Sequence, residues 1–185
     1  MTKKIEIRWH GRGGQGAVTA AKILAEAALS AGKYVQAFPE FGPERAGAPV
    51  KSFNRISDNP ITAHSQITNP NIVVVLDETL LSMINVCDGI AEDGVLVINT
   101  RKSPSEVKKD ICGGVKVAVV DATEIAMKEF GRNIPNTPMI AALAKATDVL
   151  KFDAVIDSLK SQFSKKFSAD IVDQNLRAMK EAFEK

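Results

Sequence analysis

Near its amino terminus the chain reads Ile7-Arg-Trp-His-Gly-Arg-Gly-Gly-Gln-Gly16, a glycine-rich stretch between two apolar segments. Before the glycines, apolar and polar residues alternate from Ile5 to His10, which is typical of a strand whose polar face meets water or a partner. After them, small apolar residues recur at helical spacing from Ala17 to Ala31, and Gly32 is a stop signal. The order strand, tight turn, helix predicts the start of an α/β fold.

The glycines at positions 11, 13 and 16 fit the Gly-x-Gly-x-x-Gly pattern of dinucleotide-binding turns. Such a turn lets the backbone approach a ligand closely, and the following helix offers free N–H groups to an anion. The predicted cofactor-binding residues are Gly11, Arg12, Gly13, Gly14, Gln15 and Gly16, and Gly13→Val is expected to damage the enzyme more than Cys87→Ser or Cys112→Ser. Nicotinamide binding is disfavoured, because the second strand ends at Phe38 without an acidic ribose ligand. Another anion, a partner and a purely structural turn remain alternatives.

The remaining sequence continues the α/β alternation and then becomes helical. Expected strands are Tyr34–Phe38, which gives the first half of a βαβ unit, Ile72–Leu76, Gly94–Asn99 and Val115–Val120. An inserted antiparallel hairpin is expected from Val50–Ile56 and Ile61–Ile67. Expected helices are Ser103–Ile111, Thr137–Leu150, Phe152–Phe163 and Ser168–Phe183. The prediction is one α/β domain, residues 1–185, with a Rossmann-like mainly parallel sheet, helices on both faces, the inserted hairpin and a helical C-terminal part.

Four polar residues follow predicted strands, at the sheet edge where open α/β folds bind ligands: His10, Asp77, Asn99 and Asp121. The two aspartates are equally suited to cap helices, and His10 is suited to a structural hydrogen bond as well as to catalysis. Asn136 precedes a helix with an early proline, which predicts an N-cap. Its segment is alternatively placed to face a ligand or a neighbouring subunit.

Composition and charge limit the classes of function. The 185 residues carry 24 Lys and Arg against 22 Asp and Glu, a net charge of +2, so no nucleic-acid partner is expected. Apolar runs are too short to cross a bilayer, so we expect no membrane segment and a cytoplasmic location. Cys87 and Cys112 lack the spacing of a metal site, and we expect two reduced thiols and no metal.

Four segments together resemble the gamma subunit of 2-oxoacid:ferredoxin oxidoreductases. They are the glycine stretch Ile7–Gly16, the stretch Gln36-Ala-Phe-Pro-Glu-Phe-Gly-Pro-Glu-Arg-Ala-Gly-Ala-Pro49, Phe53–Ile56 and Ile134–Met139. The resemblance extends over nearly the whole chain. Arg8-Trp-His10 and Ile134–Met139 are more similar to the pyruvate and ketoisovalerate branch than to the 2-oxoglutarate or indolepyruvate branches.

The resemblance implies an accessory subunit of a heteromultimeric enzyme. In that family a 2-oxoacid, here pyruvate, is decarboxylated on thiamine diphosphate, electrons pass through iron–sulfur clusters to ferredoxin or flavodoxin, and coenzyme A takes the acyl group. This chain lacks the cysteines for a cluster, so alpha, beta and delta partners are expected to carry these cofactors. Alone, the chain is expected to bind none of them and to be inactive. The competing interpretations are a stand-alone NAD(P)-dependent oxidoreductase and a nucleotide-binding regulatory module.

The segment Pro39–Pro49 is expected to be a subunit-contact loop. Three prolines and two glycines exclude a continuous helix or strand, and the segment is long and stiff for a simple connector. The resemblance implies that it lies near the active centre, together with the glycine turn, on the coenzyme A side. The expected contact residues are Glu40, Glu44 and Arg45, with Asn136 from a separate segment.

Overall fold

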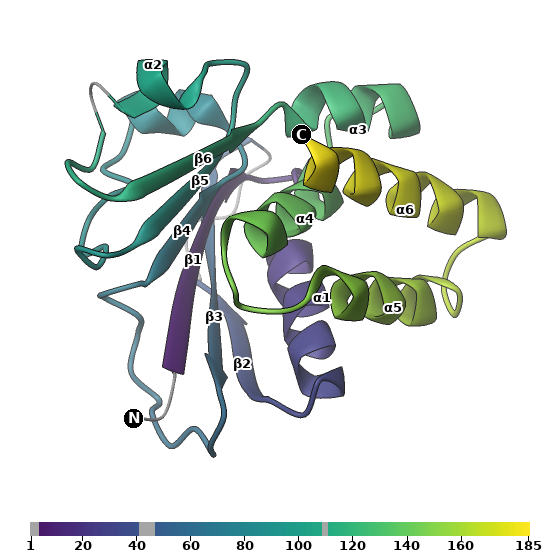
Figure 1. Ribbon diagram of the computed structural model, residues 1–185, viewed down its shortest axis with the longest axis horizontal. Coiled ribbons are helices and arrows are strands. Elements are labelled where there is room, and N and C mark those ends of the chain that lie inside the picture. The colour runs from purple at the N-terminus through teal and green to yellow at the C-terminus, as the bar shows by residue number, and fades with distance from the viewer. Residues whose placement is uncertain (1–3, 41–46, 109–110) are drawn as a thin grey trace.

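A six-stranded sheet forms the centre of the computed structural model, which describes residues 4–40, 47–108 and 111–185 (Figure 1). Its strands are β1 (Lys4–Arg12), β2 (Tyr34–Pro39), β3 (Pro49–Ser57), β4 (Ile72–Val75), β5 (Val95–Asn99) and β6 (Lys116–Val120). Across the sheet their order is β2-β3-β1-β4-β5-β6. Strands β1, β4, β5 and β6 are parallel, whereas β3 is antiparallel to both β1 and β2. The prediction of an α/β fold with a mainly parallel sheet is confirmed.

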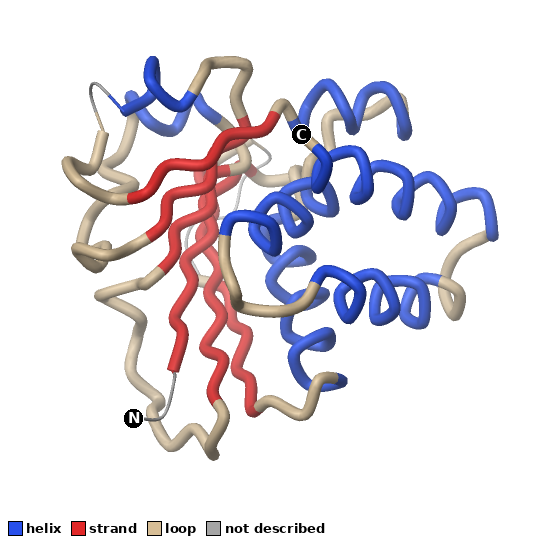
Figure 2. Tube along the Cα trace, viewed as in Figure 1, coloured by secondary structure: helices blue, strands red, loops and turns tan. Residues whose placement is uncertain are grey.

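Helices cover both faces of the sheet, as expected, but unequally (Figure 2). On the first face, α1 (Ala17–Ser30) and α4 (Asn136–Ala146) pack against the sheet. Outside them lie α3 (Ala122–Phe130), α5 (Phe152–Phe163) and α6 (Ala169–Glu184), which pack against these two helices and against one another. The second face has only the 3-10 helix η1 (Glu78–Ser82) and the short α2 (Pro104–Lys108). Helix α3 was not expected from the sequence, although its N-cap Asp121 was recognised. Within the described residues, no helix combines the length and apolar character needed to span a bilayer.

Strand β1 is buried on both faces, so the expectation that its polar face meets water or a partner is wrong. On the first face Trp9 is 0% exposed, and its indole N–H donates to Asn54 Oδ1 over 2.8 Å. Asn54 Nδ2 in turn donates to the carbonyl of Ala21 over 2.8 Å, which ties β1, β3 and α1 together. On the second face Arg8 and His10 are also buried: distant carbonyls accept hydrogen bonds from Arg8, and Arg8 donates to His10 Nε2, whereas His10 Nδ1 has no hydrogen-bond partner among the described residues.

The expected hairpin is wrong in its second strand. Val50–Ile56 lies in β3, whereas Ile61–Ile67 forms no strand. Strand β3 pairs with β2 and β1 and separates them, so the two strands of the expected βαβ unit run in the same direction without being neighbours. The carbonyls of Ala63 and Ser65 instead accept hydrogen bonds from the buried Arg55 at 3.2 and 3.0 Å. A guanidinium therefore holds this segment in place of a strand ladder.

The expectation of two reduced thiols is also wrong, because Cys87 and Cys112 form a disulfide with a Cα–Cα distance of 5.4 Å. Cys87 lies between η1 and β5, and Cys112 lies between α2 and β6. Both connections cross the second face, where the two cysteines pack against one apolar cluster. Strand β6, expected to be fully buried, is the edge strand and is only partly covered.

Candidate functional site

The glycine turn joins β1 to α1 at the carboxyl end of the sheet, beside the reversal of strand order between β1 and β4. Open α/β sheets bind ligands at this point. Gly14 and Gly16 have φ angles of 98° and 83°, in the left-handed region that favours glycine. Gly13 is not among the described residues with positive φ. The conformational demand for glycine therefore falls on Gly14 and Gly16 rather than on Gly13.

The space beside Gly16 is filled by Asn136, so the structure brings two predicted site residues together. A Cβ atom at Gly16 would lie 2.7 Å from Asn136 Nδ2, closer than real contacts allow. Asn136 was expected to be the N-cap of α4. It is instead the first residue of the helix, and Pro135 is the N-cap. Asn136 is 8% exposed and also lines a cavity of about 440 Å³. The close backbone approach at Gly16 thus serves packing between α1 and α4.

A polar network closes the crevice between β1 and β4. Gln15 Oε1 accepts from the backbone N–H of Arg12 at 2.8 Å, and Gln15 Nε2 donates to Asp77 Oδ2 at 2.7 Å. Arg12 Nε lies 3.3 Å from the same oxygen. Burial opposes ionisation of Asp77, but hydrogen bonds from Thr79 and Gln15 and the charge of Arg12 outweigh it and lower the pKa of this carboxyl. Asp77 is thus an ionised anchor for the turn and the N-cap of η1.

Next to this network is a polar pocket of about 350 Å³ at the carboxyl ends of β4, β5 and β6. It unites the predicted residues Asp77, Asn99 and Asp121, which lie far apart in the sequence. Asn99 Nδ2 donates to the carbonyl of Leu76 and to Thr123 Oγ1, both at 2.8 Å. His10, the fourth residue predicted there, does not line the pocket.

The charge of this pocket argues against a phosphate cradle. Its lining includes the carboxylates of Asp77, Glu78 and Asp121 but a single guanidinium, that of Arg101. Arg101 is already paired with Asp121, at 2.9 Å. An anionic ligand would therefore meet an excess of negative charge at close range. Hydroxyl, amide or cationic groups fit these acceptors better.

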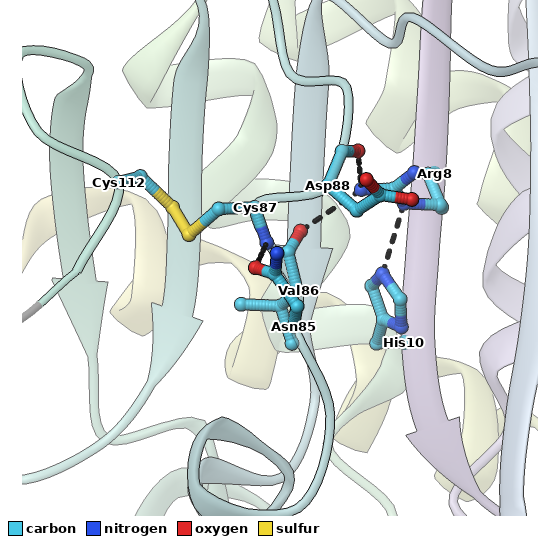
Figure 3. The surroundings of a disulfide bond; sticks show 7 residues. All are labelled: Arg8, His10, Asn85, Val86, Cys87, Asp88 and Cys112. Carbon is cyan, nitrogen blue, oxygen red and sulfur yellow. Dashed lines mark hydrogen bonds between the residues drawn. A yellow bond between two sulfur atoms is a disulfide. The ribbon is translucent and has the colours of Figure 1, made fainter.

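His10 and its neighbour Arg8 form a buried polar pair on the second face (Figure 3). Arg8 Nε donates to His10 Nε2 at 3.0 Å, so the imidazole carries its proton on Nδ1. Burial, followed by the charges of Arg8 and Lys51, lowers the pKa of His10 to about 3. At 1% exposure this imidazole is neutral and sealed, which favours the structural role over catalysis.

The pKa of His10 predicts how stability depends on pH. The folded value lies below the unfolded value of about 6.5, so its stabilising contribution is complete above that pH and is lost as the pH falls toward 3. We expect His10→Gln to reduce the slope of unfolding free energy between these limits by up to about 1.4 kcal/mol per pH unit. Urea denaturation across this range measures it. His64→Gln is the control, because His64 is exposed, and an unchanged slope in His10→Gln contradicts the prediction.

One end of the predicted contact loop, at Gly47 and Ala48, lies beside the glycine turn. The N–H of Gly13 donates to Ala48 O at 2.9 Å, and Arg12 Nη1 donates to Gly47 O at 3.0 Å. Glu40, at the other end, is exposed and pairs with Lys51 at 3.3 Å. The expected contact residues Glu44 and Arg45 lie outside the described residues.

The residues of this chain do not fit an iron–sulfur cluster. Clusters are held by cysteine thiolates, in most cases four, and both cysteines of the sequence are joined in the disulfide. Across residues 4–40, 47–108 and 111–185, no three His, Cys, Asp or Glu side chains gather as metal ligands. Any cluster of an assembled enzyme therefore needs ligands from another chain.

Comparison with known proteins identifies the family of this chain. The family model described as pyruvate ferredoxin/flavodoxin oxidoreductase matches residues 6–185. Pyruvate synthase subunit PorC of Thermotoga maritima is 50% identical, over 98% of this chain and 94% of that protein. The common gamma subunit of the pyruvate/ketoisovalerate oxidoreductases of Pyrococcus abyssi is 51% identical, over 98% of this chain and 96% of that protein.

Solved structures agree with the sequence comparison. The crystal structure of the Thermotoga maritima PORC subunit has a TM-score of 0.86 and 47% identity, covering 99% of this chain and 97% of that one. A keto/oxoacid ferredoxin oxidoreductase gamma subunit from Geobacter sulfurreducens has a TM-score of 0.78 and 26% identity, covering 99% and 96%. Sequence and fold therefore agree over nearly the full length, and the chain belongs to the pyruvate ferredoxin/flavodoxin oxidoreductase family.

Proposed function

We propose that this chain is the gamma-type subunit of a multisubunit 2-oxoacid:ferredoxin oxidoreductase acting on pyruvate. The enzyme converts pyruvate, coenzyme A and oxidised ferredoxin into acetyl-CoA, CO2 and reduced ferredoxin. Relatives named as pyruvate synthase and pyruvate/ketoisovalerate oxidoreductase subunits, each matched over nearly its whole length, support this assignment. In this proposal thiamine diphosphate and the iron–sulfur clusters are held by alpha, beta and delta subunits, and flavodoxin is the alternative acceptor.

The contribution of this chain is a surface beside the active centre. The observation that carries this proposal is the junction of the glycine turn with the end of the Pro39–Pro49 segment: Gly13 donates to Ala48, and Gly47 donates back to Gly13 at 3.3 Å. Two segments with separate sequence signals thus form one continuous rim. We place the partner subunits and the coenzyme A side of the site against this rim.

Within the rim, Arg12 is the residue best placed to meet a ligand or a partner. Its side chain is 24% exposed, and Thr79, Gly47 and Asp77 hold its guanidinium in one position. A fixed guanidinium loses little freedom on binding and makes planar contacts to carboxylate or phosphate. Gly13 and Gly14 have no side chain, so a ligand or a partner can approach the backbone of the same rim closely. Gln15 and Gly16 act from inside, since they connect the turn to Asp77 and Asn136.

A stand-alone nicotinamide enzyme fits the structure less well. Dinucleotide binding uses a parallel second strand directly beside the first, whose end supplies the ribose ligand. Here antiparallel β3 takes that place, and β2 lies at the sheet edge. The space beside Gly16 is filled by Asn136, and carboxylates line the pocket at the ends of β4, β5 and β6.

The proposal predicts that catalysis requires the other subunits. We expect the purified full chain to fold but to show no pyruvate-dependent reduction of ferredoxin or of a viologen dye. Addition of the co-expressed alpha, beta and delta chains should give coenzyme A-dependent activity, and their mixture without this chain should lack it. Turnover by the isolated chain, or full activity of the other three chains alone, rejects the proposal. Assays with pyruvate, 2-ketoisovalerate and 2-oxoglutarate determine the preferred acid.

The contact-loop proposal makes a separate prediction for Arg45→Glu. We expect weaker assembly or a raised KM for coenzyme A. The melting temperature of the isolated chain should be nearly unchanged, because a residue that acts by contacting a partner contributes little, about 0.5 kcal/mol or less, to the stability of the chain alone. Size-exclusion chromatography of the complex and thermal melting of the subunit measure the two effects. Lys160→Glu, on the exposed side of α5, is the matched control and should assemble normally. A destabilised Arg45→Glu subunit that assembles normally rejects the contact role.

A further inference from the structure

We propose that Cys87 and Cys112 form a reversible redox latch on the second face of the sheet, opened by a dithiol reductant. This inference is independent of the proposed function, since it concerns a face away from the glycine rim. The disulfide joins the connection between η1 and β5 to the connection between α2 and β6 (Figure 3). Both cysteines are half-buried rather than sealed in the core, so a reductant can reach them. Exposed disulfides are the readily reduced ones.

The latch holds a segment that also binds Arg8 of the central strand. The carbonyls on either side of Cys87, those of Val86 and Asp88, accept from Arg8 Nη2 at 2.9 and 2.6 Å. The N–H of Cys87 itself donates to Asn85 Oδ1 at 3.1 Å. The guanidinium of Arg8 therefore holds the backbone on both sides of Cys87. Arg8 lies on β1, the strand that leads into the glycine turn. Opening the disulfide removes one attachment of this segment and leaves the contacts with Arg8, the packing of Val86 and the hydrogen bond from the N–H of Ala91 to Pro70 O.

Backbone conformation at the other sulfur favours a segment that relaxes when released. Cys112, with φ 45°, is the one non-glycine residue with positive φ in the described part of the chain. Residues with a Cβ rarely adopt this region. Gly113 and Gly114 follow, and Gly114 also has positive φ, 100°, with open space around it. Cys112 therefore has a conformation that is unfavourable for a residue with a Cβ, next to two glycines that allow this segment to change conformation when the disulfide opens.

The apolar cluster beneath the latch does not depend on the disulfide. It contains Val73, Val75, Leu80, Val86, Leu96, Ile98, Val107 and Val115, whereas the two cysteines pack at its margin. Strands β4 and β5 and helix η1 contribute most of these side chains. Reduction is therefore expected to loosen the connections without unfolding the sheet.

The chemistry is thiol–disulfide exchange. One thiolate of the dithiol attacks a sulfur of the pair, the Cys87–Cys112 bond breaks, and a mixed disulfide forms. The second thiol of the reductant then displaces the remaining cysteine. Two electrons and two protons pass from the dithiol to the pair, which leaves two cysteine thiols and an oxidised reductant.

The test is a redox titration of the full chain in mixtures of reduced and oxidised glutathione, with dithiothreitol added at the reducing end. Free thiols are trapped by a maleimide that shifts gel mobility. We expect one transition in which both thiols appear together. In the reduced chain, amide hydrogen exchange of residues 84–90 should become about tenfold faster or more, with β4 unchanged. Cys87→Ser and Cys112→Ser should show this faster exchange without any dithiol. If these variants fail to fold, wild-type protein reduced and alkylated while folded serves instead.

Three results overturn the latch. Thiols that stay free in oxidised glutathione show that no disulfide forms. A pair that resists dithiothreitol until the whole chain unfolds is a structural cross-link. Reduction that leaves the exchange of residues 84–90 unchanged shows that the disulfide does not hold this segment.

Discussion

Replacing Gly16 by valine is expected to lower the free energy of unfolding by about 2–5 kcal/mol, a large part of the roughly 5–15 kcal/mol that is typical of a folded domain. Two costs combine at this position. The backbone angle, φ 83°, is strained for any residue with a Cβ, by about 1–2 kcal/mol. The added atoms also meet Asn136 Nδ2 at 2.7 Å, and both α1 and α4 must shift to make room. Urea denaturation of the full chain measures the loss.

Gly14→Val separates these two costs. Gly14 also has positive φ, 98°, but a Cβ there meets nothing within 4 Å. It should therefore lose only the conformational part, about 1–2 kcal/mol. Combining Gly16→Val with Asn136→Gly should recover part of the loss by opening the space beside Gly16. Equal stability of the Gly16→Val and Gly14→Val variants would show that packing against Asn136 contributes nothing.

Arg55→Ala is expected to destabilise the chain by about 3–5 kcal/mol. Arg55 is 2% exposed and pairs with Glu6 at 2.6 Å. Truncation leaves Glu6 with only the half-exposed Lys4, at 3.3 Å, and removes the donor to the carbonyl of Ser65. Arg55 also donates to Gln36 Oε1 at 2.7 Å and so connects three strands. Thermal and urea unfolding measure the effect, and the segment around Ala63 should lose hydrogen-exchange protection at the same time.

Arg177→Ala is the matched control, because Arg177 makes a similar 2.8 Å contact with Glu129 but is 59% exposed. Exposed ion pairs contribute about 0–1 kcal/mol, so this variant should resemble the wild type. Arg55→Lys keeps the charge but not the fork of donors, and it should lie between the two. A loss no larger in Arg55→Ala than in Arg177→Ala contradicts the assigned role of the buried guanidinium.

Local patterns predicted the parts of the fold that depend on local physics. The strand, glycine turn and helix from β1 to α1 are correct, since periodicity and glycine placement act within a few residues. The buried strand β4 is correct for the same reason. The hairpin failed because Asn59-Pro60 is a turn signal, while strand pairing depends on partners elsewhere: β3 pairs with β2 across a long connection.

Long-range contacts explain the errors at the candidate site. Arg8 looks like a solvent-facing residue until the carbonyls of Val86 and Asp88, some 80 positions later, are placed against its guanidinium, which also donates to His10. The disulfide could not be predicted from the sequence for the same reason, because its two cysteines meet only in the folded chain. By contrast, Asp77, Asn99 and Asp121 were expected to meet, because parallel strands bring their carboxyl ends to one edge. Topology made that prediction possible without any knowledge of side-chain contacts.

The buried indole of Trp9, which joins β1, β3 and α1, also serves as an intrinsic fluorescence probe. Trp9 is the single tryptophan of the sequence, and the single tyrosine, Tyr34, is 47% exposed at the sheet edge. Selective excitation of the indole therefore monitors one location, the interface between α1 and the sheet next to the glycine turn. Its emission should shift to the red when Gly16→Val disturbs α1, whereas opening the disulfide on the opposite face should leave the spectrum unchanged.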